Sequence, residues 1–97
     1  MDFSDEYRKI LWWLLIATRG GEKRIEIIKI LRKNPENLYK LSEDLNVNYR
    51  TAEHHVKVLL NNNIIKRMGN GYGSIYFLSD YYDKHFDIIE EIIKNYK

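Results

Sequence analysis

The most informative pattern of apolar and polar residues runs from Leu45 to Leu60. Asn48 has a side-chain oxygen that can accept a hydrogen bond from the free amides at the start of a helix. Four apolar residues then repeat at the spacing of a buried helical stripe: Ala52, Val56, Leu59 and Leu60. The opposite stripe is polar throughout: Arg50, Glu53, His54, Lys57 and Asn61. The pattern predicts a helix from Tyr49 to Asn61 or Asn62 with one polar, donor-rich face.

Two further helices are predicted upstream. Glu22 to Lys33 is apolar on one side, and two sets of residues can face the core: Ile25, Ile28 and Leu31, or Ile27, Ile30 and Leu31. Pro35 closes this segment because it biases Asn34 away from the helical conformation. Leu38 to Leu45 forms the next helix, with Asn37 as a plausible cap. Its apolar face contains Leu38, Leu41 and Leu45, and Asn46-Val47 is the turn that follows.

The first predicted helix runs from Phe3 to Thr18. Ser4 opens it, and Asp5-Glu6 places carboxylates in the first turn, where they complement the exposed amides. Gly20-Gly21 ends it. The stretch Ile10 to Ala17 is apolar on every side, and such a helix must be covered on more than one face. One small domain seldom covers both sides of its terminal helix, so we expect a partner subunit to help.

A hairpin and a last helix are predicted in the final third of the chain. Ile64 to Met68 and Ser74 to Leu78 are β-prone runs, and the glycine-rich segment 69–73 between them contains Asn-Gly, a strong hairpin signal. Asp80 is expected to cap a helix that extends to about Tyr96. Five side chains alternate four and three residues apart along it, as in a heptad seam: Tyr82, Phe86, Ile89, Ile93 and Tyr96.

This order of elements predicts a mainly α fold with a small β-hairpin, a winged helix-turn-helix. We expect a single domain over residues 1–97, in which residues 22–78 form a DNA-binding core. Residues 1–18 and 80–97 supply the helices of a homodimer interface. A chain of this length buries only about 60 to 65% of its unfolded surface, which makes help from a second subunit unsurprising.

Charge distribution adds to this picture more than net charge does. The sum is only +2, but residues 46–79 carry Arg50, Lys57, Lys66 and Arg67 against Glu53 alone. Residues 80–97 carry five acids against three lysines. Positive charge therefore collects in the middle of the chain, which favours a polyanion partner there.

Several classes of protein are disfavoured by the sequence. Without cysteine, disulfides and thiolate metal sites are excluded. The longest apolar run, residues 10–17, is far too short to cross a bilayer, and the acids before it are unlike a signal peptide, so a cytoplasmic protein without membrane contact is expected. No catalytic motif is visible, and the adjacent His54 and His55 point about 100° apart on a helix. We expect no enzyme and no cofactor.

The stretch from Ile25 to Leu78 resembles winged-helix transcriptional regulators of the ArsR-like group, especially small archaeal ones. The most specific part is Thr51-Ala52-Glu53-His54-His55-Val56-Lys57-Val58-Leu59, which looks like the family's run of Thr, small apolar, polar, His-His, apolar, Lys, apolar, Leu. Asn62-Asn63-Ile64-Ile65 matches the family's exit into the first wing strand. The resemblance covers a little over half of the chain.

The resemblance also implies a homodimer paired through its first and last helices, which are the two helices with excess apolar surface. The side chains expected at this interface are Leu11, Trp12, Leu15, Tyr82, Phe86, Ile89, Ile93 and Tyr96. Metal-sensing members use cysteines, or an Asp-x-His followed by His-x-x-Glu on the last helix. Asp83-Lys84-His85 imitates the first half, but Tyr96 stands eleven residues on, so no metal site is expected.

Candidate DNA contacts lie on the polar face of the Tyr49 helix and on the hairpin. Arg50 can bond O6 and N7 of guanine, and Lys57 suits a phosphate. Tyr49 and Thr51 have hydroxyls that suit phosphates or base edges, or that pack and cap. The full set expected at the DNA is Asn48, Tyr49, Arg50, Thr51, Glu53, His54, Lys57, Arg67, Asn70 and Tyr72.

For three further features, a purely structural role is the alternative to contact with DNA or a ligand. His55 adjoins the apolar stripe and is expected to be a half-buried structural residue. Lys66 and Arg67 alternate sides on the first wing strand, so at most one faces the duplex, and the hairpin can also be plainly solvent-exposed. Trp12-Trp13 is interpreted as core plus interface, with a small-molecule pocket between the terminal helices as the alternative.

The sequence therefore predicts a homodimeric, sequence-specific regulator that binds double-stranded DNA at a palindromic operator. Its helix from Tyr49 would enter the major groove, with the hairpin as wing. The alternative is a winged-helix module that binds other proteins and never DNA. Any small-molecule effector is unknown from the sequence.

Overall fold

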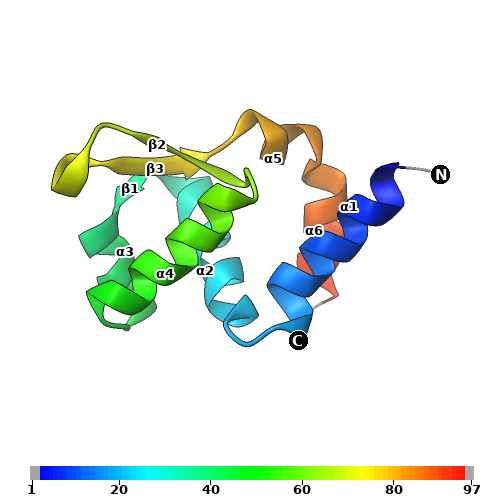
Figure 1. The fold of residues 1–97 in the computed structure, drawn as a ribbon, viewed down its shortest axis with the longest axis horizontal. Coiled ribbons are helices and arrows are strands. Elements are labelled where there is room, and N and C mark those ends of the chain that lie inside the picture. Colours follow the sequence, from blue (N-terminus) through cyan, green and yellow to red (C-terminus); the bar gives the residue numbers. More distant parts are fainter. Residues whose placement is uncertain (1–2, 96–97) are drawn as a thin grey trace.

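The computed structural model describes the backbone of residues 3–95 and the side chains of residues 6–95. Along the chain the elements are α1 (Phe3–Trp12), the π-helical turn η1 (Trp13–Ala17), α2 (Gly21–Lys33), β1 (Glu36–Asn37), α3 (Leu38–Leu45), α4 (Tyr49–Asn61), β2 (Ile65–Met68), the 3₁₀ turn η2 (Gly71–Gly73), β3 (Ile75–Leu78), α5 (Asp80–Lys84) and α6 (Phe86–Lys94). Figure 1 shows α1 and α6 at one end of the molecule and α3, α4 and the hairpin tip at the other.

The helix-turn-helix consists of α3 and α4, with the predicted bounds and caps. Asn37 Oδ1 accepts from the amide of Lys40, and Asn48 Oδ1 accepts from the amide of Thr51, each at 2.8 Å. Asn46 ends α3 in the left-handed region at φ 56°, which asparagine tolerates better than most residues. Both predicted caps are confirmed, and they fix where the two helices meet.

The core gathers around α2. The two alternative core sets of this helix merge, because Ile25, Ile27, Ile28 and Leu31 are all buried while Ile30 is only partly so. In α4 the predicted stripe is buried at Ala52, Val56 and Leu59, but Leu60 is only partly buried. His55 occupies the remaining inward position of α4.

The hairpin pairs as predicted and gains a third strand. β2 and β3 are antiparallel, with Ile65 opposite Leu78 and Met68 opposite Ile75. β1 pairs with the other edge of β3, which gives the strand order β1-β3-β2. The sequence did not predict β1, because a two-residue strand shows no alternation.

The first helix changes character at its end. It runs as α1 and then as η1, where five-residue spacing replaces the α-helical one. Leu11, Leu14 and Leu15 are buried, whereas Trp12 and Trp13 are 52% and 59% exposed. The core part of the tryptophan interpretation is therefore wrong, because the leucines already fill the inner side of the helix. The predicted roles of the Ser4 and Asp5 side chains lie outside the described residues.

The last helix differs from its prediction in two ways. Its cap is Ser79 and not Asp80, since Ser79 Oγ accepts from the amide of Tyr82 at 3.1 Å. The helix is also divided at His85, whose backbone departs from helical geometry at φ −114° and ψ 21°. Tyr96 lies outside the described residues.

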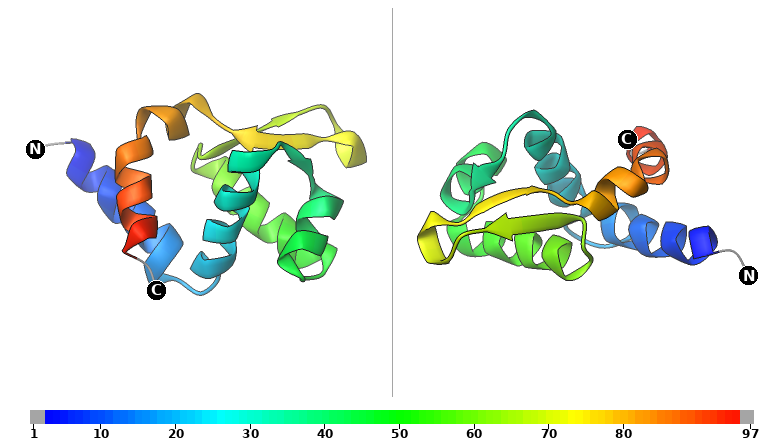
Figure 2. Two further views of the ribbon diagram at one scale, coloured as in Figure 1. Left: turned by 180° about the vertical axis from the view of Figure 1, so that it is seen from behind. Right: turned by 90° about the horizontal axis from the view of Figure 1, so that it is seen from above.

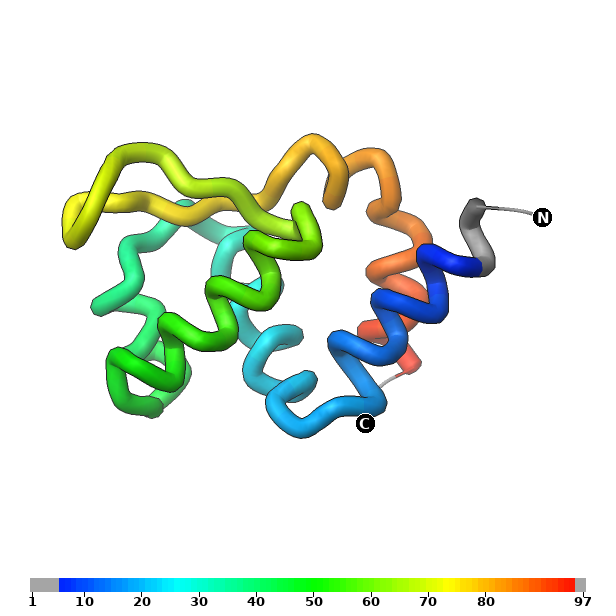
Figure 3. Tube along the Cα trace, viewed as in Figure 1, coloured from blue at the N-terminus to red at the C-terminus, as the bar shows by residue number. Residues whose placement is uncertain are grey.

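The terminal helices pack against each other within the chain. The ring of Tyr7 lies edge-on to that of His85, with centroids 4.0 Å apart, and Arg8 pairs with Glu91 at 2.7 Å. These contacts align the two helices in the same direction, as Figures 2 and 3 show from different sides. The terminal helices thus form one unit that sits apart from α3 and the hairpin tip.

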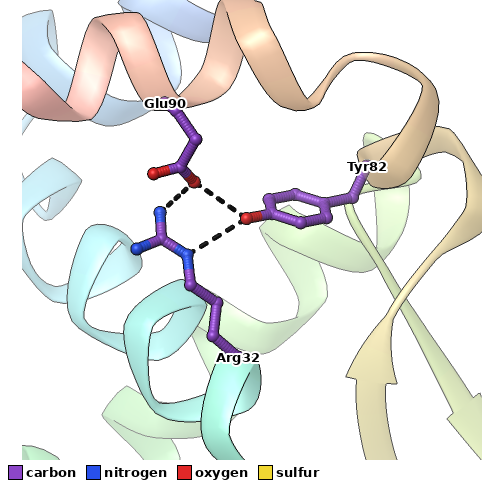
Figure 4. Close-up of polar contacts among 3 residues, drawn as sticks. All are labelled: Arg32, Tyr82 and Glu90. Atoms are coloured by element: carbon purple, nitrogen blue, oxygen red, sulfur yellow. Dashed lines mark hydrogen bonds and ion pairs between the residues drawn. The ribbon is translucent and has the colours of Figure 1, made fainter.

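A polar cluster joins this terminal unit to α2 (Figure 4). Arg32 Nε donates to the Tyr82 hydroxyl at 3.1 Å, and that hydroxyl donates to Glu90 Oε2 at 2.8 Å. Arg32 Nη2 also pairs with Glu90. Burial raises the pKa of Tyr82 above its ordinary value, so the hydroxyl keeps the proton that it donates.

The turn between η1 and α2 depends on Gly21. A Cβ on Gly21 would stand 2.3 Å from the carbonyl oxygen of Leu15, which is backbone and cannot swing away. Gly20 adds a positive φ of 94°, a conformation that costs other residues more. The pair lets η1 lie directly on the start of α2.

We expect Gly21→Ala to lower the free energy of unfolding by about 1 to 3 kcal/mol, the usual cost of overpacking. Gly73→Ala is the matched control, because nothing lies within 4 Å of a Cβ at that position. Urea unfolding of the two variants measures the difference. Equal stability of both would show that η1 does not rest on Gly21.

Candidate nucleic-acid interface

One face of α4 is free of contacts with the core. Arg50, His54 and Lys57 are exposed along it, and Glu53 is partly buried. The buried stripe on the opposite side fixes the rotation of the helix, so these side chains point away from the chain. The structure thus brings together the polar stripe that the sequence predicted.

The start of α4 combines free donors with a fixed backbone. Asn48 uses its side-chain oxygen to cap the helix, which leaves its amide group available to donate. Thr51 supplies the capped amide, and its hydroxyl has no hydrogen bond within the described part of the chain. Helix amino ends also favour anions through their aligned amides.

The hairpin reaches back toward this helix end. Tyr72, which is 91% exposed at the tip, lies with its ring centroid 6.3 Å from that of Tyr49. Burial raises the pKa of Tyr49, and Glu53, Tyr72 and Tyr76 raise it further. Tyr49 therefore keeps a neutral hydroxyl that can donate.

Strand register separates the two basic residues of the wing. Arg67 lies opposite Tyr76, and Lys66 lies opposite Phe77. Side chains of opposed residues share a face of the sheet, and Tyr76 is buried on the face near Tyr49. Arg67 is therefore on the α4 side, while Lys66 faces away and lies 3.9 Å from Asp80. Asn70 is exposed before the tip.

His55 belongs to a buried polar junction and not to the exposed face. It is 6% exposed, and its Nδ1 accepts from Arg24 Nη1 at 3.2 Å. The structural interpretation of His55 is confirmed. Sequence reasoning missed Arg24, which is 4% exposed, because nothing in the local pattern separates it from the other basic residues.

The residues predicted for the dimer interface fall into two groups. Leu11, Leu15, Tyr82, Ile89 and Ile93 are buried inside the chain itself, where a second copy could not touch most of their surface. Trp12 and Phe86 are exposed, and Ile10 and Trp13 join them. Tyr96 is outside the described residues. The outward apolar surface is thus carried by residues that the heptad pattern only partly selected.

A groove lies between α1, η1 and α6. Its volume is about 410 Å³, and its walls include Trp12, Trp13, Ile16 and Ile92, with the Arg8 and Glu91 pair at its side. This is the position at which the sequence left a small-molecule pocket open. Most of the wall surface is apolar, and the polar groups that line it belong to Arg8, Lys9, Glu91 and Asn95.

His85 is held by contacts within the protein. Its Nδ1 lies 2.9 Å from the carbonyl oxygen of Tyr81, and its ring packs on those of Tyr7 and Tyr81. Among the side chains of residues 6–95, no group of three or more His, Asp or Glu residues comes together in a way that could hold a metal ion. Within the described chain, no helix has the length and apolar character needed to cross a membrane.

Comparisons with known proteins agree with this geometry. Residues 21–67 match the model of the bacterial regulatory protein, arsR family. Reduced HlyU from Vibrio cholerae aligns with 92% of this chain and 85% of its own at 17% identity and a TM-score of 0.67. A second similar structure is a homodimeric winged helix-turn-helix DNA-binding domain from Mycobacterium bovis, a possible ArsR-family regulator. It aligns with 94% of this chain and 82% of its own, at 12% identity and a TM-score of 0.69.

At these identities the solved structures establish the fold alone, and no curated protein sequence matches the chain. The fold and the exposed face of α4 define a winged helix-turn-helix of the class used by DNA-binding transcriptional regulators. The matched segment contains the whole helix-turn-helix and most of the first wing strand, so residues 21–67 are similar to the DNA-binding region of arsR-family regulators.

The junction at His55 makes stability depend on pH. Burial lowers the pKa of His55, and Arg24, His54 and Lys23 lower it further. Between the lowered pKa and the ordinary value of about 6.5, the unfolded chain therefore binds more protons than the folded one. We expect the contribution of His55 to the free energy of unfolding to be complete above pH 6.5 and to decline as the pH falls below it.

Urea unfolding between pH 7.5 and 5 measures this decline. His55→Asn, which keeps an acceptor near Nδ1 but does not titrate, should flatten the curve relative to the natural chain. His54→Asn, a change at the exposed neighbour, should keep most of the slope. An unchanged slope in His55→Asn would assign the pH dependence to other groups.

Proposed function

We propose that the protein is a sequence-specific regulator that binds double-stranded DNA as a homodimer in the cytoplasm. The observation that carries the proposal is the capped, donor-rich face of α4 beside a wing whose Tyr72 reaches the same helix end. α4 would enter the major groove, where Arg50 reads a base edge and Lys57 contacts a phosphate. The remaining contacts are proposed for Asn48, Tyr49, Thr51, Glu53, His54, Arg67, Asn70 and Tyr72.

The homodimer is proposed to form through the terminal unit. Trp12 and Phe86 would lie in the interface, and Ile10 and Trp13 are two further exposed apolar side chains of the first helix. The buried residues predicted for the interface would pack behind these exposed side chains: Leu11, Leu15, Tyr82, Ile89 and Ile93. Tyr96 remains part of the proposed interface. A twofold dimer presents two copies of α4, so the operator should be roughly palindromic, with half-sites about 10 base pairs apart or a multiple of that.

We expect Arg50→Ala to weaken operator binding by about 1 to 3 kcal/mol for each half-site and to relax the sequence preference at one base pair. Lys57→Ala should weaken binding to all sequences similarly. It should also make the slope of log affinity against log salt concentration shallower by about one for each half-site, because one phosphate contact is lost. Lys84→Ala, which removes the same charge from α5, is the control. Fluorescence anisotropy on an operator selected from random DNA, at several salt concentrations, measures these effects.

Unchanged affinity in both α4 variants would contradict the proposed docking. A natural chain that retains no fragment from random or genomic DNA at low salt would contradict the function itself. Capture of a protein partner through α4 in that case would support the interaction module.

Trp12→Glu is expected to shift the dimer toward monomer, because it places a charge in an apolar interface that must exclude water. Tyr39→Glu is the control, since Tyr39 is a similarly exposed aromatic residue on α3. Sedimentation of both variants over a range of concentrations gives the dissociation constants. A monomeric natural chain that binds one half-site and two half-sites equally would refute the dimer.

A further inference from the structure

Arg24 occupies a buried position between two parts of the molecule. It lies in the first turns of α2, and its guanidinium bonds in two directions. Toward the terminal unit, Nε donates to the carbonyl oxygen of Leu14 at 2.9 Å and Nη2 donates to Thr18 Oγ1 at 2.6 Å. Toward α4, Nη1 donates to His55 Nδ1 at 3.2 Å. One side chain therefore ties the end of the first helix to the helix proposed to read DNA.

The backbone around Arg24 is built to bring these partners together. Leu14 is among the last residues of the first helix, where carbonyl groups have no amide donor within the helix. Thr18 closes η1 by donating from both its amide and its hydroxyl to the carbonyl oxygen of Trp13, at 3.1 Å and 2.9 Å. The π-helical turn thus presents to α2 one free carbonyl group and one fixed hydroxyl.

Gly20 allows α4 to approach this turn. A Cβ at Gly20 would stand 2.5 Å from Cε1 of His55 and 3.1 Å from Nη1 of Arg24. The ring of His55 therefore packs directly on the backbone between η1 and α2. Arg24 and His55 are both buried where these three elements meet, and an arginine with unpaired donors would be costly at such a position.

The other polar links of α2 do not include α4. Arg32 bonds to Tyr82 and Glu90 of the terminal unit, and Lys23 donates to the carbonyl oxygen of Leu45 in α3 at 3.1 Å. Among the side chains of residues 6–95, Arg24 makes the hydrogen bond that connects α4 to α2, and through α2 to η1. The apolar core packs α4 in place but allows small rotations that directional bonds resist.

We propose that Arg24 is a positioning residue that sets the angle between α4 and the terminal unit, and thereby the half-site spacing that the dimer accepts. The inference rests on the proposed function. In a dimer joined through the terminal helices, the relative placement of the two α4 helices depends on this angle twice, once in each protomer. A small rotation at the junction therefore moves two reading helices away from successive major grooves.

The spacing preference of the dimer tests this role. Duplexes carry two copies of the selected half-site at the best spacing and at spacings changed by one, two and three base pairs, and another duplex carries one half-site. Anisotropy titrations compare the natural chain with Arg24→Met, which keeps the length of the side chain but removes its donors. Lys29→Met is the matched control, because Lys29 is an exposed cation on the same helix.

The natural chain and Lys29→Met are expected to lose affinity steeply as the spacing changes. Arg24→Met loses all three of the hydrogen bonds to Leu14, Thr18 and His55, of which only the bond to His55 reaches α4. It should bind the best spacing about tenfold less tightly, which corresponds to the loss of that one charge-assisted link. It should bind the changed spacings nearly equally and the single half-site as tightly as the natural chain. Such a flattened profile is not what a general loss of stability would produce.

His55→Leu is the second variant, because it removes the acceptor on α4 and leaves the bonds of Arg24 to Leu14 and Thr18 in place. It should flatten the spacing profile as Arg24→Met does, and the double variant should add little, since the two residues act through one contact. If Arg24→Met fails to fold, His55→Leu carries the test alone.

A steep profile in folded Arg24→Met or in His55→Leu would overturn the inference while leaving DNA binding intact. An equal loss on the single half-site would also overturn it, since Arg24 would then support α4 itself and not its placement. Absence of DNA binding by the natural chain would instead defeat the proposed function, and the inference with it.

Discussion

The burial of one cation, Arg24, organises the way in which this chain holds its helices. A residue as buried as Arg24, which is 4% exposed, needs hydrogen-bond acceptors around its guanidinium, and more than one part of the chain supplies them. The carbonyl group of Leu14 and the hydroxyl of Thr18 come from the end of the first helix, and the ring of His55 comes from α4. The π-helical turn and Gly20 contribute to the same site, because they bring the Leu14 carbonyl group, the Thr18 hydroxyl and the His55 ring close to Arg24.

The second arginine of α2 extends this arrangement to the other end of the chain. Arg32, Tyr82 and Glu90 bind α2 to α5 and α6, so one helix connects the first helix, the last helix and α4. The hydrophobic core alone would permit sliding between such short helices, since dispersion and burial are not directional. Directional polar contacts at both ends of α2 therefore determine how the terminal unit faces α4.

Sequence reasoning succeeded where structure depends on nearby residues. Asn37 and Asn48 stand directly before apolar periodic runs, so the bounds of α3 and α4 and the exposed face of α4 could be read from local spacing. The family match over residues 21–67 covers the same segment. The predictions failed where structure depends on contacts distant in sequence. β1 forms only by pairing with β3, and Arg24 is buried through its bonds to Leu14 and His55. Trp12 and Trp13 face outward because leucines fill the inner side of the first helix. The displaced cap at Ser79 was a local error, since serine directly before the acid was the better capping signal.

The modest charge of the chain bears on why a dimer matters to its proposed function. A net charge of +2 gives little long-range attraction to DNA, and α4 and the wing together carry only four cations, Arg50, Lys57, Lys66 and Arg67, against Glu53. Linking two such surfaces makes the second contact intramolecular, and the gain depends on whether the linkage lets both sites engage at once. A loose linkage would spread that gain over many spacings, whereas a rigid one concentrates it on a single operator geometry. Rigidity between the terminal unit and α4 is therefore what would turn two weak contacts into selective recognition.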